Sequence, residues 1–170
     1  MDVQICLSKS EDLENILELQ AESLRALSPN YNLDQIESLI RNQRLARLQI
    51  NESIIVAKYN NQIIGFASLL NQQTRIGGIY VHPNFVSQGI GTQMLCAIEQ
   101  IARQNKYKVI EVISYLSSVT FYQKNGYQII SESAFYCENH VWITCVNLEK
   151  QLMNLTEIEQ LCLWLKKLFF

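Results

Sequence analysis

The stretch from Ile79 to Ala102 constrains the fold more than any other part of this chain. Its first residues, Ile79-Tyr80-Val81, end a strand-like run that leads into a short loop over residues 82–88. A helical pattern of apolar residues begins at Ile90, and Gly89 and Gly91 flank that start. A glycine loop that opens a helix presents free backbone N–H groups and the positive end of the helix dipole. The stretch therefore predicts an anion site, and phosphate is the usual anion at such sites.

Length, charge and cysteine usage bound the kind of protein. A chain of 170 residues is most economically one domain, and folding at this size hides roughly 70% of the unfolded surface, so no metal or disulfide staple is needed. A formal net charge of −2 argues against general nucleic-acid binding. The five cysteines form no Cys-x-x-Cys pair, so we expect neither a metal site nor a disulfide framework. The polar N-terminus and the lack of a long apolar run predict a cytoplasmic protein without a membrane partner.

The first half of the chain predicts three strands and two helical regions before the Ile79–Ala102 stretch. Alternating apolar residues indicate a strand over 3–7, and helical spacing predicts helices over about 11–27 and about 33–48, with a break near Asn42 left open. Two apolar runs then flank Asn60-Asn61. Asparagine tolerates the positive φ of a two-residue hairpin turn, so these runs predict a β-hairpin.

The second half predicts further strands around a short helix. Lys108 to Ile113 is nearly all apolar and β-branched, which is typical of a strand covered on both faces. A helix is predicted over 117–124, where Asn125-Gly126 ends it. Two more strands are predicted over 127–130 and 142–148, with an irregular connection between them.

The last segment predicts an amphipathic helix. Thr156 and Glu159 have capping-box spacing, and apolar residues line one face of the helix that follows. That face is too wide to leave in water, so we expect it to pack on its own domain or on a second subunit.

The Gly89-Ile90-Gly91 pattern by itself fits more than one phosphate-binding loop. A Walker loop needs lysine after its last glycine, but Thr92 follows Gly91, so that interpretation fails. A dinucleotide fingerprint needs a third small residue where Met94 stands, and its acidic residue belongs at the end of the next strand, whereas Glu111 lies inside it. The loop alone therefore disfavours a dinucleotide-binding site but does not exclude one.

A second motif, Phe121-Tyr122-Gln123-Lys124-Asn125-Gly126-Tyr127, follows the predicted strand that begins at Lys108. Together with the Ile79–Ala102 stretch it resembles the GNAT acetyltransferase superfamily, whose members transfer an acyl group from acyl-coenzyme A to an amine. The loop of that family is Gln/Arg-x-x-Gly-x-Gly/Ala, and its later signature is close to Phe-Tyr-x-x-x-Gly-Phe. The resemblance implies a mixed α/β fold, with a mostly antiparallel central sheet flanked by helices. It implies a GNAT domain over residues 1–149, and residues 150–170 form an additional C-terminal helical extension.

The resemblance also implies acetyl-CoA as the co-substrate. The pyrophosphate would meet the loop and the first turn of its helix, at Val86, Ser87, Gln88, Gly89, Ile90, Gly91 and Thr92. The pantetheine arm would pair with the strand Ile79, Tyr80, Val81, chiefly with the backbone of Ile79 and Val81, and Ser117 stands about where many members carry a pantetheine-binding asparagine. Tyr122 matches the family tyrosine beside the thioester sulfur, where a phenol can protonate the departing thiolate. Packing beside Phe121 is the structural alternative for Tyr122.

Two departures from the family pattern affect the chemistry. Val86 replaces the usual Gln or Arg of the loop, which removes one side-chain donor to the phosphates. The strand before the loop holds Gly77-Gly78 and no carboxylate, where many relatives place a general base. A replacement base could be Glu111 or His82, but we favour direct attack by an amine that loses its proton to solvent. The two glycines predict either an open acceptor pocket or a local bulge.

The sequence therefore predicts an acetyl-CoA-dependent N-acetyltransferase that acts by direct transfer to a primary amine. The acceptor is a small molecule or a peptide, and a homodimer is one expected assembly. The competing hypothesis is a non-catalytic acyl-CoA-binding or interaction module on the same fold.

Overall fold

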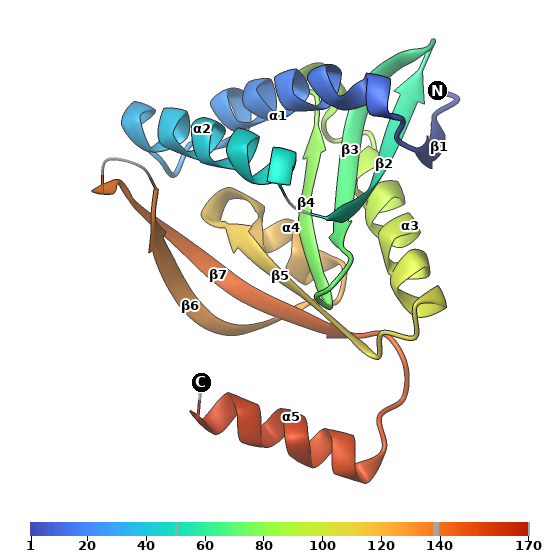
Figure 1. The fold of residues 1–170 in the computed structure, drawn as a ribbon, viewed down its shortest axis with the longest axis vertical. Helices are drawn as coiled ribbons and strands as arrows, with labels where there is room; N and C mark the ends of the chain where they lie inside the picture. Colours follow the sequence, from blue (N-terminus) through green and yellow to red (C-terminus); the bar gives the residue numbers. More distant parts are fainter. Residues whose placement is uncertain (50, 138–139, 170) are drawn as a thin grey trace.

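The computed structural model of the protein describes residues 1–49, 51–137 and 140–169, in which a seven-stranded sheet has the order β1-β2-β3-β4-β5-β7-β6 (Figure 1). The strands are Gln4–Leu7 (β1), Glu52–Tyr59 (β2), Gln62–Leu70 (β3), Arg75–Val81 (β4), Val109–Tyr115 (β5), Gln128–Tyr136 (β6) and Trp142–Gln151 (β7). Neighbouring strands are antiparallel except for β4 and β5, which are parallel. The predicted mixed, mostly antiparallel sheet is confirmed.

Five α-helices accompany the sheet in the described part of the chain. They are Leu13–Leu27 (α1), Leu33–Gln49 (α2), Ile90–Gln104 (α3), Val119–Lys124 (α4) and Glu157–Phe169 (α5). Local signals predicted several of their boundaries and turns. Asn60 and Asn61 both have positive φ in the β2–β3 hairpin, and Gly126 has φ +89° just after α4.

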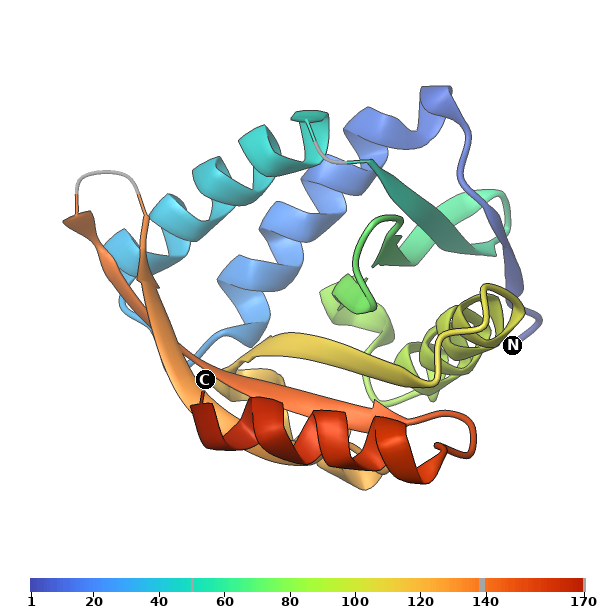
Figure 2. The same cartoon turned by 60° about the horizontal axis from the view of Figure 1, so that its bottom comes forward.

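Alternate residues of the same strands build two cores on opposite faces of the sheet. On β2, Ile55 and Ala57 join the cluster that includes α3, whereas Val56 joins the cluster that includes α1 and α2. Figures 1 and 2 show α1 and α2 together on one side, with α3 on the other. Tyr122 of α4 belongs to the α3 cluster, and Tyr80 of β4 belongs to the α1–α2 cluster. The sheet thus separates an α3–α4 side from an α1–α2 side.

Three local predictions differ from the structure. Helix α2 continues through Asn42 without the break that was left open. Strand β5 is covered on one face only, because Glu111 and Ile113 are exposed while their neighbours are buried. Strand β6 extends to Tyr136, into the segment predicted to be irregular, because β7 pairs with it along its length. Pairing with β7 decides the length of β6, and packing over the sheet decides which face of β5 is covered. Sequence periodicity indicates neither.

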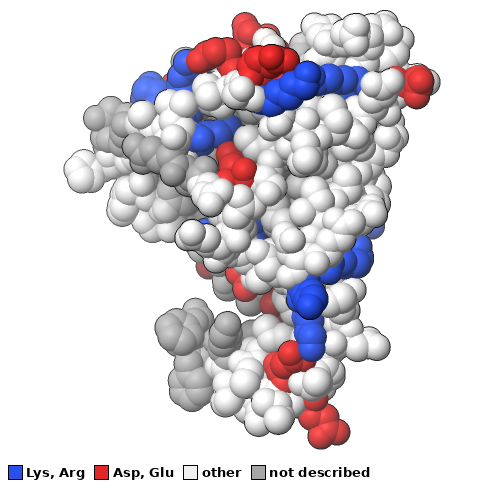
Figure 3. Space-filling model, turned by 45° about the vertical axis from the view of Figure 1, so that its right-hand side comes forward, with Lys and Arg blue, Asp and Glu red and all other residues white. Residues whose placement is uncertain are grey.

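The C-terminal helix α5 stands apart from the sheet, as a lobe below the domain in Figure 3. Its capping box is present, since the Glu159 carboxylate accepts from the Thr156 N–H at 2.8 Å. Lys108 donates to both oxygens of Glu159 at 2.8 Å, which ties the helix to the start of β5 and, with Thr156, lowers the pKa of Glu159 to about 2. Its apolar face is open: Ile158 is 75% exposed and Trp164 56%. No helix in the described ranges has the length and apolar character needed to span a membrane.

Candidate functional site

Strands β4 and β5 diverge in the middle of the sheet. They pair at Arg75–Glu111 and Ile76–Val112, and the pairing goes no further along the described strands, although β4 continues to Val81. Parallel strands that separate leave backbone N–H and C=O groups unpaired along the gap. The sheet therefore opens a gap toward the loop that follows β4.

The gap begins at a β-bulge formed by Gly77. Opposite β3, Ser68 pairs with Gly78 and Leu69 pairs with Ile76, so Gly77 is the extra residue. Gly78 has φ +152°, a conformation that L side chains rarely adopt. Of the two alternatives raised by the glycine pair, the bulge is confirmed.

The backbone of Ile79 and Val81 faces this gap. The His82 N–H donates to the Ile64 carbonyl of β3 at 2.9 Å, and hydrogen-bonded pairs recur at every second residue of an antiparallel ladder. Tyr80 and Gly78 therefore turn their backbone groups toward β3. Those of Ile79 and Val81 point to the opposite edge, where β5 has moved away.

The loop after β4 delivers the N-terminus of α3 to the same gap. Ser87 and Gly89 both adopt positive φ, at +61° and +80°, which turns the chain sharply into the helix. The Gln93 N–H is bonded to the Gly89 carbonyl, whereas the preceding N–H groups of the first turn have no intrahelical acceptor. A Cβ built at Gly89 would meet nothing within 4 Å. This helix start is open to an anion from outside.

A cavity of about 630 Å³ joins these features through the sheet. It runs from the first turn of α3, along the gap beside β4, to the end of α2. The predicted co-substrate-binding residues line it, namely Ile79, Tyr80, Val81, Val86, Ser87, Gly89, Ile90, Gly91, Thr92, Ser117 and Tyr122. Gln88 is the exception: it is exposed, and its side chain donates to the Asn84 carbonyl at 3.4 Å.

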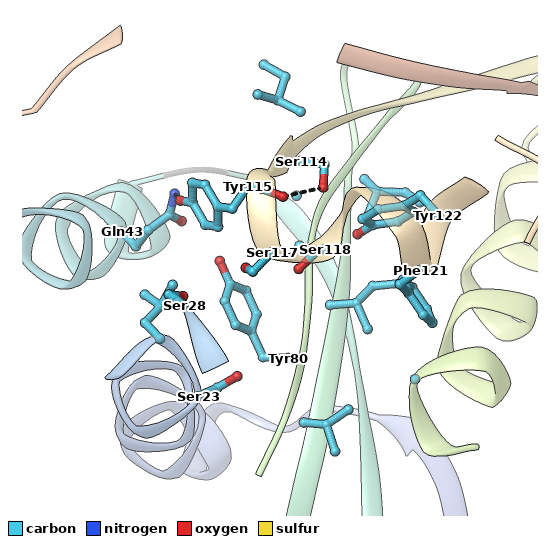
Figure 4. A pocket seen from close by; sticks show the side chains of 18 of the residues that line it. Ser23, Ser28, Gln43, Tyr80, Ser114, Tyr115, Ser117, Ser118, Phe121 and Tyr122 are labelled. Carbon is cyan, nitrogen blue, oxygen red and sulfur yellow. Dashed lines mark hydrogen bonds between the residues drawn. The ribbon is translucent and has the colours of Figure 1, made fainter. Parts of the chain in front are cut away.

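Tyr122 lies in the wall of this cavity, and Figure 4 shows its hydroxyl directed into the interior, where Ser117 and Ser118 also lie. Its side chain is almost fully buried and makes edge contacts with the rings of Phe121 and Tyr127. Burial raises the pKa of the phenol well above its ordinary value, with a smaller contribution from Tyr80. The hydroxyl therefore stays protonated at neutral pH and can donate a proton. Tyr122 therefore lines the cavity and also has the packing role considered as its alternative.

The α2 end of the cavity holds polar groups that the sequence did not single out. Arg47 of α2 donates to Glu52 of β2 at 2.6 Å and to Gln20 at 3.1 Å. Gln43 of α2 donates to the Tyr115 hydroxyl at 2.8 Å (Figure 4). Arg47, Glu52, Gln43 and Tyr115 all line the cavity. Helix α2 and strand β2 gave no motif, so only the three-dimensional arrangement brings these residues to β4.

The two candidate replacement bases named from the sequence lie elsewhere. Glu111 is exposed on β5, and it is absent from the cavity lining. His82 accepts the Asn84 N–H at its Nδ1 and pairs through Nε2 with Glu22 at 3.3 Å. His82 is likewise not among the residues of the cavity wall, and its bond to Asn84 gives it a loop-shaping role.

Comparison with known protein families gives one match over most of the chain. Residues 25–152 match the profile of the acetyltransferase (GNAT) domain. The matched region runs from the end of α1 through β7 and includes the Ile79–Ala102 stretch, the Phe121–Tyr127 motif and Glu52. No curated protein matches the chain.

Solved structures share the fold at low sequence identity. A GCN5-related N-acetyltransferase from Rhodopseudomonas palustris superposes with a TM-score of 0.82 at 22% identity, covering 89% of this chain and 96% of that one. The PaiA N-acetyltransferase of Thermoplasma acidophilum, in complex with coenzyme A, gives 0.69 at 22% identity over 89% and 99% of the two chains. YncA of Salmonella typhimurium, a putative acetyltransferase with its cofactor acetyl-CoA, gives 0.65 at 16% over 92% and 97%. These likenesses establish the fold.

Proposed function

This chain belongs to the GNAT acetyltransferase family, and we propose that it transfers an acetyl group from acetyl-CoA to a primary amine. The observation that carries the proposal is the single cavity that joins an open helix N-terminus, the unpaired edge of β4 and the Tyr122 hydroxyl. Its volume of about 630 Å³ is in the range of small-molecule and cofactor sites. Two of the similar structures contain coenzyme A or acetyl-CoA.

The donor side of the cavity suits the two polar parts of coenzyme A. The pyrophosphate would bind at the start of α3, where free N–H groups and the helix dipole favour negative charge. The open space beside Gly89 leaves room for phosphate oxygens close to the backbone. The amide-rich pantetheine arm would extend the sheet along Ile79 and Val81, as an added strand does at an exposed edge. Val86 adds no side-chain donor, so this cradle relies on the backbone.

The acetyl group would pass directly from acetyl-CoA to the amine, without an acyl-enzyme. The neutral amine nitrogen attacks the thioester carbonyl, the N–C bond forms, and the nitrogen loses a proton to solvent. The C–S bond of the tetrahedral intermediate then breaks with its electron pair on sulfur. A backbone N–H near Val81 would stabilise the oxyanion. The Tyr122 phenol would donate a proton to the thiolate and regain one from solvent.

The second candidate is a non-catalytic acyl-CoA-binding or interaction module, favoured by the absence of a carboxylate on β4. Both candidates bind the same donor, so binding does not separate them. The test is release of free thiol from acetyl-CoA in the presence of a panel of small amines and of peptides with free N-termini. Release above the buffer rate with any amine supports the enzyme, and a rate equal to buffer for the whole panel supports the module.

A further inference from the structure

A carboxylate from another strand lies against the part of β4 that lacks one. A Cβ built at Gly77 would lie 3.2 Å from Oε2 of Glu52 and 2.5 Å from the Ser68 hydroxyl oxygen. Glu52 stands at the first position of β2, opposite Leu70, two strands away from β4. Its carboxylate therefore reaches past β3 and lies beside the space that a side chain at position 77 would take.

The bulge explains why this place is available. Because Gly77 is an extra residue relative to β3, a side chain at this position would point toward the side chains of Ser68 and Leu70. Any larger residue at 77 would collide with Ser68, so the strand carries no side chain of its own here. Glu52 and Gly77 both line the cavity, and the carboxylate is the acidic group nearest to the bulge in the cavity wall.

Arg47 fixes the direction of this carboxylate. It binds Oε1 of Glu52 at 2.6 Å and is itself held by Gln20 and by the ring of Phe66, whose centroid lies 4.8 Å from the guanidinium carbon. The Arg47 and Glu52 side chains are only 3% and 6% exposed. With Oε1 held on that side, Oε2 is the oxygen beside Gly77. A buried ion pair of this kind gives little net stability compared with apolar residues of the same volume. The pair instead holds the Glu52 carboxylate in a fixed place in the cavity wall.

We propose that Glu52 receives the acceptor amine and takes the proton that the amine must lose before attack. This inference rests on the proposed function. The ammonium donates a hydrogen bond to Oε2, the proton moves to the carboxylate, and the neutral nitrogen attacks the thioester carbon. After the N–C bond forms, the nitrogen loses its second proton to solvent. Tyr122 donates a proton to the sulfur and regains one from solvent, and Glu52 releases its proton to solvent. The acceptor class is a primary amine that is protonated at neutral pH.

Other charged and titratable groups face the same end of the cavity. They are Arg47 of α2, Tyr80 and Arg75 of β4, and Tyr115 of β5. Burial raises the pKa of Tyr80 and of Tyr115, so both phenols remain neutral over the pH range of the test. The two arginines keep their charge throughout it. Glu52 is therefore the group in this set that accepts the proton of the amine. Without its carboxylate, turnover depends on the fraction of the amine that is already neutral in solution.

The test compares Glu52→Gln with the wild type, using the amine that the wild type acetylates best. At neutral pH we expect kcat/KM for the amine to fall about 10²-fold or more, with unchanged affinity for acetyl-CoA by calorimetry. The deficit should shrink by about tenfold per pH unit toward the pKa of the amine, because solvent then supplies the neutral amine. A merely structural role would give a deficit that does not change with pH.

Two further variants keep the test interpretable. Glu14→Gln makes the same change in an exposed carboxylate paired with Arg44, outside this cavity, and should behave as wild type. Glu52→Asp keeps the charge near Arg47 and withdraws the carboxylate by one methylene, so it should retain the fold and show an intermediate deficit. If Glu52→Gln does not fold, a Glu52→Asp rate equal to wild type overturns the inference.

The outcomes separate this inference from the proposed function. A Glu52→Gln enzyme as active as the wild type, or one with a deficit constant over pH, overturns the role of Glu52 and leaves the acetyltransferase intact. A wild type that releases no thiol with any amine contradicts the function itself, and the inference then fails with it.

Discussion

Gly91 in the first turn of α3 and Phe121 in α4 pack directly against each other. A Cβ at Gly91 would lie 3.3 Å from one ring carbon of Phe121 and 3.5 Å from another. The ring of Phe121 in turn makes an edge contact with Tyr122, at 5.1 Å between centroids. The helix that presents the anion site and the tyrosine of the second motif are therefore coupled through one aromatic ring.

We predict that Gly91→Ala lowers turnover while leaving stability nearly unchanged. The added methyl group must displace Phe121, which moves Tyr122, but alanine is about 1 kcal/mol more favourable than glycine within a helix and offsets the crowding. Urea unfolding and steady-state kinetics measure the two effects.

Gly89→Ala is the matched comparison, and we expect it to weaken acetyl-CoA binding. Its φ of +80° costs a non-glycine residue about 1–2 kcal/mol, and its methyl group would enter the open space at the helix start. Calorimetry with acetyl-CoA measures the affinity. If both glycine variants lost affinity equally, the distinction between a packing glycine and a binding glycine would be wrong.

Tyr122→Phe should lower kcat by about 10²-fold or more without changing the affinity for acetyl-CoA, because it removes the only proton that this side chain can donate. Tyr127→Phe is the control. Its ring lies beside Tyr122, but its hydroxyl donates to Glu99 at 3.2 Å and does not line the cavity. Unaltered turnover in Tyr122→Phe would exclude the phenol from the mechanism.

Most residues that the sequence assigned to the donor side line one cavity, because the signals that identified them are local. The loop–helix start at Gly89 and the motif around Tyr122 are each contiguous in sequence. The contact between Gly91 and Phe121, however, gives this glycine a packing role that the sequence did not indicate. Only the three-dimensional structure distinguishes the two.

The α1–α2 side was not predicted because it depends on contacts between distant parts of the chain. Glu52 reaches Gly77 through the β2–β3–β4 register and the bulge, and a lone glutamate at the start of a strand carries no motif. The exposed outer face of β5 was not predicted for the same reason. An apolar run in the sequence does not show which of its faces another part of the chain will cover. For α5 the amphipathic pattern was clear, but its surroundings were not.

Truncation after Met153, which removes α5, should leave acetyl-CoA affinity and turnover unchanged. Strand β7 ends at Gln151, Leu152 packs on the core, and no described residue of α5 lines the cavity. Calorimetry, kinetics and light scattering on the truncated chain measure binding, activity and assembly. Lys108→Glu, which breaks the pair with Glu159, is the full-length counterpart. A loss of affinity in both variants would place the extension within the working domain.

Stability should fall above pH 10 as buried tyrosines ionise on unfolding. Burial raises the pKa of Tyr31, Tyr80, Tyr115, Tyr122 and Tyr127 above the ordinary value of 10. These groups therefore contribute stability that is complete below pH 10 and is lost as pH rises toward their folded-state values. For each such tyrosine, the free energy of unfolding falls by up to about 1.4 kcal/mol per pH unit above 10. Phenolate absorbance and circular dichroism should change together, and phenolate formation at these five positions in a native fold would contradict the prediction.

The most direct test of the central claim follows both products of the reaction. The purified chain is incubated with acetyl-CoA and each amine of the panel, and mass spectrometry quantifies acetylated amine and free coenzyme A over time. For at least one amine we predict that the two products appear in equal amounts, at a rate above buffer that rises with enzyme concentration. Coenzyme A released without acetylated amine, or no release with any amine, would contradict the assignment as an N-acetyltransferase.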